Sequence, residues 1–156
     1  MSTRISTIVF IAFIAACTGP AALTSTGERI PPHTNTIYIV TEDDEDVAFK
    51  KMAQLFVGSG YSLKSSDSEL GAISTDRRKI GQGKLELYPQ DVWFTALVME
   101  GEQTKIQLRG AFQGQNLQDD IRLFGATGSY QRVAWNEMLE LAQKYEGASL
   151  EFAINK

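Results

Sequence analysis

Hydrophobic residues recur at the spacing of an amphipathic helix in two stretches of the chain, residues 43–57 and 130–145. Side chains three or four positions apart lie on the same face of a helix, so each stretch is predicted to be a helix with one apolar face. Thr41 is expected to cap the first helix and Ser129 the second, because both hydroxyls can accept a hydrogen bond from the first turn. The apolar positions that set the spacing include Val47, Ala48, Met52, Leu55 and Phe56 in the first helix and Val133, Ala134, Leu139, Leu141 and Ala142 in the second.

Apolar and polar residues alternate in much of the remaining chain, which is the pattern of half-buried strands. The clearest pair is 93–99 with 104–112, and Gly101 lies in the turn between them. A short strand or turn is expected at residues 121–124, inside a long connection over residues 113–129. The other predicted strands are 37–40, 61–65, 71–75 with a continuation to residue 79, 85–87 and 149–154.

The order of these elements predicts the fold class. A strand and a helix come first, several antiparallel strands follow, and a long helix and a short strand come last. Amphipathic helices need an apolar sheet face to cover, and an antiparallel sheet can leave its other face in contact with water. We therefore expect an α+β two-layer sandwich, an antiparallel sheet with two helices packed on one face, as a single domain over residues 37–156.

The first 17 residues have the outline of a secretory signal peptide. Arg4 is their only charged residue, and residues 8–14 form a continuous apolar run. Such a run is much shorter than the roughly 20 residues that a membrane-spanning helix needs, so a cleaved signal is the better interpretation. Residues 17–36, rich in Thr, Gly and Pro, are expected to form a flexible tether in which His33 is a solvated residue.

Residues 14–17, Ile-Ala-Ala-Cys, resemble the lipobox of bacterial lipoproteins. The resemblance implies that residues 1–16 are removed and that the Cys17 thiol carries diacylglycerol, with an acyl chain on the new amino group and no other cofactor. Two or three such chains would hold the protein durably on a membrane, since one chain alone binds only marginally. Thr18 in place of Asp implies sorting to the outer membrane, with the domain facing the periplasm.

Composition excludes several classes of function. The chain has 15 Lys and Arg against 19 Asp and Glu, so it lacks the basic surface that nucleic-acid binding needs. One Cys and one His exclude a disulfide framework and a Cys-rich zinc site. The acidic run at residues 43–46 lacks the ligand order of a calcium loop, and residues 81–84 lack the spacing of a phosphate-binding loop. Adjacent acids such as Asp119 and Asp120 would support a hydrolase only if they converged in a cleft, so we expect a protein that is not an enzyme.

A second resemblance concerns the domain. The first predicted helix ends in Gly-Ser-Gly-Tyr at residues 58–61, a strand pair ends at residues 71–75, and a hairpin and a Trp-containing helix follow. This pattern resembles the helix-grip domains of envelope lipoproteins, the BamC-like domains of the outer-membrane β-barrel assembly machinery, over residues 37–154. The resemblance implies the α+β fold and an envelope location. It does not imply a role in barrel assembly, because this chain has one such domain where that protein has two.

Two further functional hypotheses follow from this architecture. The leading one is an interaction or scaffold domain that binds an envelope protein partner through the 113–129 connection or an exposed sheet edge. The alternative is a binder of an apolar or amphipathic small ligand between sheet and helix, in a pocket lined by residues such as Trp93, Phe112 and Trp135. The carboxylate hydrolase stays the weakest of the three hypotheses.

Overall fold

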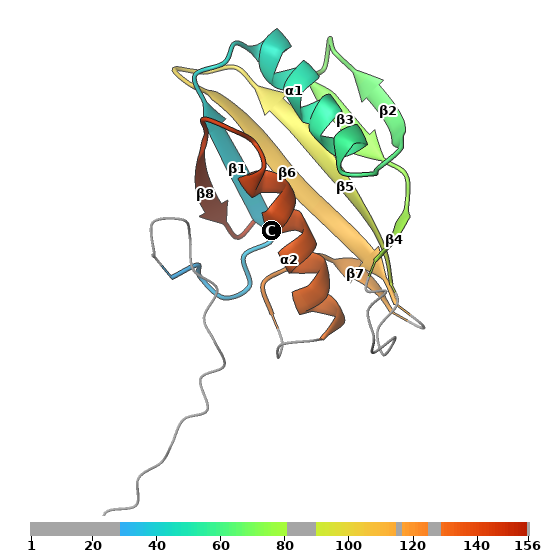
Figure 1. The fold of residues 1–156 in the computed structure, drawn as a ribbon. Coiled ribbons are helices and arrows are strands. Elements are labelled where there is room, and N and C mark those ends of the chain that lie inside the picture. The colour runs from blue at the N-terminus through green and yellow to red at the C-terminus, as the bar shows by residue number, and fades with distance from the viewer. Residues whose placement is uncertain (1–28, 81–89, 115–116, 125–128, 156) are drawn as a thin grey trace, which may run out of the picture.

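The computed structural model describes residues 29–80, 90–114, 117–124 and 129–155. Within these residues, eight strands form one antiparallel sheet, and both helices pack on the same face of it (Figure 1). The helices are α1 (Glu45–Gly58) and α2 (Tyr130–Gln143). The predicted class, an α+β sandwich of an antiparallel sheet and two helices, is confirmed.

The strands are β1 (Thr36–Thr41), β2 (Leu63–Asp67), β3 (Ala72–Thr75), β4 (Arg78–Ile80), β5 (Gln90–Met99), β6 (Thr104–Gln113), β7 (Gln118–Asp120) and β8 (Ser149–Ala153). Their order across the sheet is β2-β3-β5-β6-β1-β8, so β2 and β8 are its edges. The two short strands extend this order lengthwise: β4 pairs with β5 beyond the end of β3, and β7 pairs with β6 beyond the end of β1. The predicted strand at residues 85–87 lies outside the described residues.

The helix starts differ from expectation at one of the two predicted caps. Ser129 caps α2 as predicted, by accepting a hydrogen bond from a backbone amide of the first turn. For α1 the cap is Asp44, whose carboxylate accepts from the amide of Val47 at 2.9 Å. The prediction of Thr41 was wrong, because Thr41 is the last residue of β1 and its hydroxyl accepts instead from the amide of Asp43. An Asp binds the first-turn amides as well as Thr does, so the run of five acids at residues 42–46 obscured the true helix start.

The core lies between the sheet and the two helices. Strands β5 and β6 alternate along their length, with every second side chain buried against the helices. Trp135 of α2 and Phe56 of α1 bring the largest apolar surfaces to this layer. Phe56 stacks on Phe94 with ring centroids 6.3 Å apart, and Tyr61 packs edge-on against Phe94 at 5.2 Å. The other large side chains that are almost fully buried are Phe112, Ile37, Ile39, Met52, Ile73, Ile106, Leu108, Ile121 and Met138.

In the described part of the chain, no helix covers the other face of the sheet, which we call the open face (Figure 1). It carries the second set of alternating side chains, which are partly or fully exposed on β5 and β6. On β5 these include Trp93 and Thr95, and on β6 they include Arg109 and Ala111. An antiparallel sheet with one face on the core and one in water is thus the form that the alternation predicted.

The packed part of the chain begins before residue 37. Ile30 is 2% exposed and belongs to the core, and the side chains of Thr34 and Thr36 are fully buried. The amide of His33 donates to the carbonyl of Leu123 at 2.8 Å, and His33 has a left-handed backbone with φ of 64°. Residues 30–36 therefore belong to the domain, although composition had assigned them to the tether.

Two predicted strands shift in position. In the connection after β6, the strand is β7, at residues 118–120, and not at residues 121–124. Ile121 and Leu123 instead bury their side chains, at 0% and 6% exposure, and extend the core. The expected continuation of the strand 71–75 to residue 79 is a separate strand, β4, which pairs with β5.

Candidate functional site

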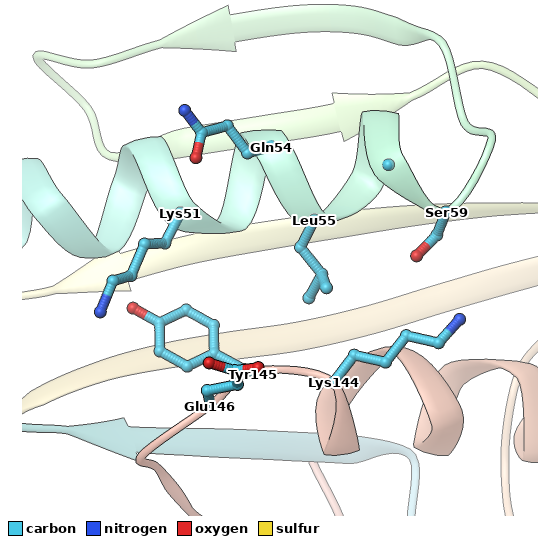
Figure 2. Close-up of a pocket in the computed structure, with 8 residues that line it drawn as sticks. Lys51, Gln54, Leu55, Ser59, Lys144, Tyr145 and Glu146 are labelled. Carbon is cyan, nitrogen blue, oxygen red and sulfur yellow. The ribbon is translucent and has the colours of Figure 1, made fainter.

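The described surface is hollowed on both sides of the sheet. On the helical side, a groove of about 470 Å³ lies between α1 and the turn that follows α2 (Figure 2). We call it the inter-helix groove. Its lining residues are Lys51, Gln54, Leu55, Gly58, Ser59, Lys144, Tyr145 and Glu146. On the open face, hollows of about 570 Å³ and 240 Å³ share Trp93 and Thr95 as lining residues.

One wall of the inter-helix groove is fixed by a cluster of polar contacts. The ammonium of Lys51 donates to the carboxylate of Asp43 at 2.6 Å, and the Tyr145 phenol donates to the same carboxylate at 2.9 Å. The Lys51 ammonium also lies 5.7 Å from the centre of the Tyr145 ring. Figure 2 shows the Lys51 and Tyr145 side chains meeting between the helices. This wall joins the start of α1 to the end of α2.

The same contacts set the protonation of both acids in the wall. The hydrogen bonds from Lys51 and Tyr145 lower the pKa of Asp43, because both stabilise its charged form. Burial raises the pKa of Tyr145, and its hydrogen bond to the Asp43 carboxylate raises it further. At neutral pH Asp43 is therefore ionised and Tyr145 keeps its proton. Groups whose pKa values lie far from neutral pH are poor general acids or bases at that pH, so the contacts of Asp43 and Tyr145 are better suited to holding the structure together.

The rest of the groove is free to make contacts. Leu55 points from α1 into the space between the helices, and the Lys144 side chain runs toward Ser59 (Figure 2). The ammonium of Lys144 has no hydrogen bond or ion pair with any side chain in the described part of the chain. Gly58 leaves the rim open, because a side chain there would meet nothing within 4 Å. The groove therefore presents the apolar side chain of Leu55 together with the Lys144 ammonium, which has no partner among the described side chains.

A second polar cluster holds the end of α1 against α2. Arg78 donates to the carbonyl of Ser59 and to the carboxylate of Glu137, each at 3.0 Å. The phenol of Tyr61 donates to the same carboxylate at 2.7 Å, and the Arg78 guanidinium lies 4.7 Å from the Tyr61 ring centre. Arg78 therefore lies on the helical side of the sheet. The sequence gives no signal for the partner, because Glu137 is 59 residues away.

Trp93 lies on the open face of the sheet, among charged and polar side chains that contact it or one another. The guanidinium of Arg77 lies 4.6 Å from its ring centre, and Arg77 also donates a hydrogen bond to Gln113. On β6, the guanidinium of Arg109 lies 4.0 Å from the carboxylate of Asp120 on β7. All of these groups lie on the open face.

The three residues named for an apolar ligand pocket do not line one cavity. Phe112 and Trp135 are fully buried in the core, whereas Trp93 lies on the open face. In the register, Phe112 pairs with Val92 and shares its inward direction, and Trp93 pairs with Ala111 and shares its outward direction. The alternation of β5 and β6 therefore separates the residues that the hypothesis joined.

The two adjacent acids of the hydrolase hypothesis also face opposite sides. Asp119 contacts Gln131 of α2 and accepts from Arg122 at 2.8 Å, whereas Asp120 lies beside Arg109 on the open face. Within the described residues, no three His, Cys, Asp or Glu side chains gather where they could hold a metal ion. His33 stacks on Phe124 with ring centroids 5.1 Å apart, so it has a packing partner at the domain surface.

Cys17, the predicted lipidation site, lies outside the described residues. Neither helix in the described part of the chain is long and apolar enough to cross a membrane. No known protein-family model matches the chain, and no curated protein matches it either.

Proposed function

We propose that this protein is a lipid-anchored component of the bacterial cell envelope whose α+β domain binds a protein partner. The anchor would be diacylglycerol on the Cys17 thiol, with an acyl chain on the amino group after removal of residues 1–16. The support is the sequence at residues 14–17, the apolar run before it and the single Cys in the chain. Thr18 favours the outer membrane, and the domain would face the periplasm.

Chain length restricts how far the domain can lie from such an anchor. Residues 17 and 30 are 13 positions apart, and Ile30 is already in the core. A fully extended chain spans at most about 3.6 Å per residue, so Ile30 can lie no more than roughly 47 Å from the lipid. The partner would therefore be a membrane protein or a protein held close to the membrane surface.

The inter-helix groove is the surface on which we place this partner. The observation that carries this placement is that Leu55 and Tyr145 line the groove together with Lys144, whose ammonium has no hydrogen bond or ion pair with a side chain of the described residues. This combination suits an extended polypeptide segment that inserts one apolar side chain and directs a carboxylate to Lys144. The 113–129 connection is less suitable than the sequence suggested, because Ile121 and Leu123 are buried.

Lipidation is tested with radiolabelled palmitate in cells that produce the full chain. We expect labelling of the wild-type protein and none in Cys17→Ser, together with a globomycin-sensitive change in mass. The Ser variant should keep its signal segment, because the lipoprotein signal peptidase acts on the lipidated Cys. Equal labelling of the Cys17→Ser variant would end the anchor assignment.

The groove is tested by photo-crosslinking in intact cells. A photoreactive residue at Gln54 lines the groove, whereas one at Lys50 is exposed on the same helix and outside it. We expect one defined adduct from position 54, none of that mass from position 50, and loss of the adduct when Lys144→Glu is added. Identical adducts from both positions, or an adduct indifferent to Lys144→Glu, would contradict docking in the groove.

A further inference from the structure

The open face carries a second site that the protein-docking groove does not account for. Its smaller hollow, of about 240 Å³, is lined by Trp93, Thr95, Arg109, Gly110, Ala111 and Asp120. These residues come from three neighbouring strands, β5, β6 and β7. The site lies on the opposite side of the sheet from the inter-helix groove, so the two can be tested separately.

The strand register explains why a hollow forms beside the indole. Ala111 is the direct partner of Trp93 on one side and of Asp120 on the other. A methyl group thus stands between two large side chains, on the same face as both. The Trp93 indole and the Asp120 carboxylate form two sides of the hollow, and the short Ala111 side chain leaves the space between them unfilled.

The charged pair at this hollow has unused hydrogen-bonding capacity. The closest approach of Arg109 to Asp120 is 4.0 Å, which is too long for a hydrogen bond. Neither side chain makes a hydrogen bond to any other described residue, and their side chains are 39% and 61% exposed. A guanidinium offers five donors and a carboxylate about four acceptor positions. A polar ligand between the two groups can therefore accept hydrogen bonds from Arg109 and donate hydrogen bonds to Asp120.

The indole supplies a different kind of surface. Trp93 is held in place by the Arg77 guanidinium, which itself donates to Gln113. An aromatic ring has a negative face that attracts weakly positive C–H groups as well as cations. Apart from this ring, the hollow is lined by hydroxyl, charged and very small side chains. A ligand that fits must therefore combine a C–H face with several hydroxyl groups and no net charge.

We propose that this hollow binds one unit of a neutral oligosaccharide. The C–H face of a sugar ring packs on Trp93, one hydroxyl donates to the Asp120 carboxylate, and its neighbour accepts from Arg109. The larger hollow of about 570 Å³ continues on the other side of Trp93 and receives an adjacent unit. Its lining is again mixed in charge, with Lys64, Ser74, Thr75, Asp76 and Arg77.

A simple anion fits the pair less well. The acid and the guanidinium balance one another in the small hollow, and Asp120 would repel a phosphate or sulfate placed beside Arg109. A protein interface would need a buried apolar centre, whereas among the described residues Trp93 is the only large apolar side chain that lines either hollow. Neutral hydroxyl groups both donate and accept hydrogen bonds, so they can pair with the Asp120 carboxylate and the Arg109 guanidinium at the same time.

Tryptophan fluorescence of the full chain in detergent micelles gives a direct test. The chain has two Trp residues, and Trp135 is fully buried, so a ligand on the open face changes the emission of Trp93. The probes are maltotriose, cellotriose and tri-N-acetylchitotriose, with sodium phosphate as the anionic comparison. We expect a saturable change with at least one of the three sugars and no saturation with phosphate.

Three variants locate the binding on the hollow. Asp120→Asn and Arg109→Gln each remove one charged partner and should weaken binding by about tenfold or more. Ala111→Met fills the floor without removing any polar group and should abolish binding. Lys105→Ala changes a half-buried residue of β6 that lies outside both hollows and pairs with Glu151, and this variant should bind as the wild type does.

Three results would overturn the proposal. These are the absence of saturation with all three sugars, saturation by phosphate alone, or wild-type affinity in Ala111→Met while its circular dichroism and thermal midpoint stay native. Leu55→Ala in the inter-helix groove should leave sugar binding unchanged. Failure of this proposal therefore leaves the crosslinking test of the groove intact.

Discussion

The phenol of Tyr145 donates a 2.9 Å hydrogen bond to the carboxylate of Asp43, across 102 residues of sequence. It ties the turn after α2 to the connection between β1 and α1. Lys51 donates to the same carboxylate from one α-helical face, so a single acid receives a phenol and an ammonium. The wall of the inter-helix groove depends on this acid staying ionised.

Stability should therefore fall in acid through Asp43. Its pKa is lowered by Lys51 and Tyr145 from the ordinary value of 3.8. A carboxyl group with a lowered pKa in the folded state contributes stability above its ordinary value, and that stability is lost as the pH falls through the lowered one. We expect Asp43→Asn to show a flatter loss of stability than the wild type below about pH 4.

Urea unfolding at a series of pH values measures this difference. Asp46→Asn is the matched control, because Asp46 is an exposed acid in the first turn of α1. It should leave the acid limb of the profile close to that of the wild type. Tyr145→Phe removes one of the three side-chain donors to Asp43, leaving Lys51 and Thr41, and should give an intermediate slope. Parallel profiles for Asp43→Asn and the wild type would show that the carboxylate adds no stability.

The true helix start provides a second prediction. Asp44 accepts from the amide of Val47, so Asp44→Ala should lower the free energy of unfolding by about 0.5–2 kcal/mol. Asp44→Asn and Asp44→Ser keep an acceptor at the cap and should restore most of that loss. Denaturant unfolding at neutral pH compares the three variants. A loss as large in Asp44→Ser as in Asp44→Ala would mean that the cap is not the cause.

The sequence predicted the elements of this fold well because periodicity reports which face of an element is buried. The alternation of β5 and β6 and the helical spacing of α2 each depend on local pattern alone. The cap of α1 was placed three residues early, at Thr41 instead of Asp44, since neighbouring polar residues compete for the same capping role. Ile30 was missed because an isolated apolar residue in a segment rich in Pro and Thr has no period.

The candidate sites were harder to predict, because they join residues that are distant along the chain. The inter-helix groove depends on the angle between two helices, which places Leu55 opposite Tyr145, 90 positions later. The hollow beside Trp93 depends on strand register, which sets Ala111 against it. Hydrophobicity had grouped Trp93 with Phe112 and Trp135, although in the observed register Trp93 pairs with Ala111, so Trp93 and Phe112 face opposite sides. The alternation of apolar and polar residues predicts which face of a strand is buried, but the residues that lie beside one another on that face follow only from the strand register.

Phe94 packs against α1 and the residues that follow it, which predicts a large effect of its removal. It is fully buried, stacks on Phe56 of α1 and packs edge-on against Tyr61. Phe94→Ala should lower the free energy of unfolding by about 3–5 kcal/mol, because it removes apolar contacts and leaves a cavity. Leu97→Ala on the same strand is the control, since Leu97 is 38% exposed on the open face and should cost far less. Equal losses in urea unfolding would mean that the helical layer is not closely packed at Phe94.

Two glycines should respond in opposite directions to the same substitution. A methyl group at Gly110 would lie 2.6 Å from the Phe94 ring and 2.9 Å from Ile121, well inside van der Waals contact. Gly110→Ala should therefore destabilise the fold by about 1–3 kcal/mol, since both neighbours are packed in the core and have little room to move. At Gly58, the last residue of α1, the added methyl group meets nothing within 4 Å. Gly58→Ala should stabilise the protein by about 0.4–1 kcal/mol, because alanine loses less backbone freedom on folding. Thermal unfolding of both variants measures the pair, and a stable Gly110→Ala variant would show that β6 moves away from Phe94 to admit a side chain.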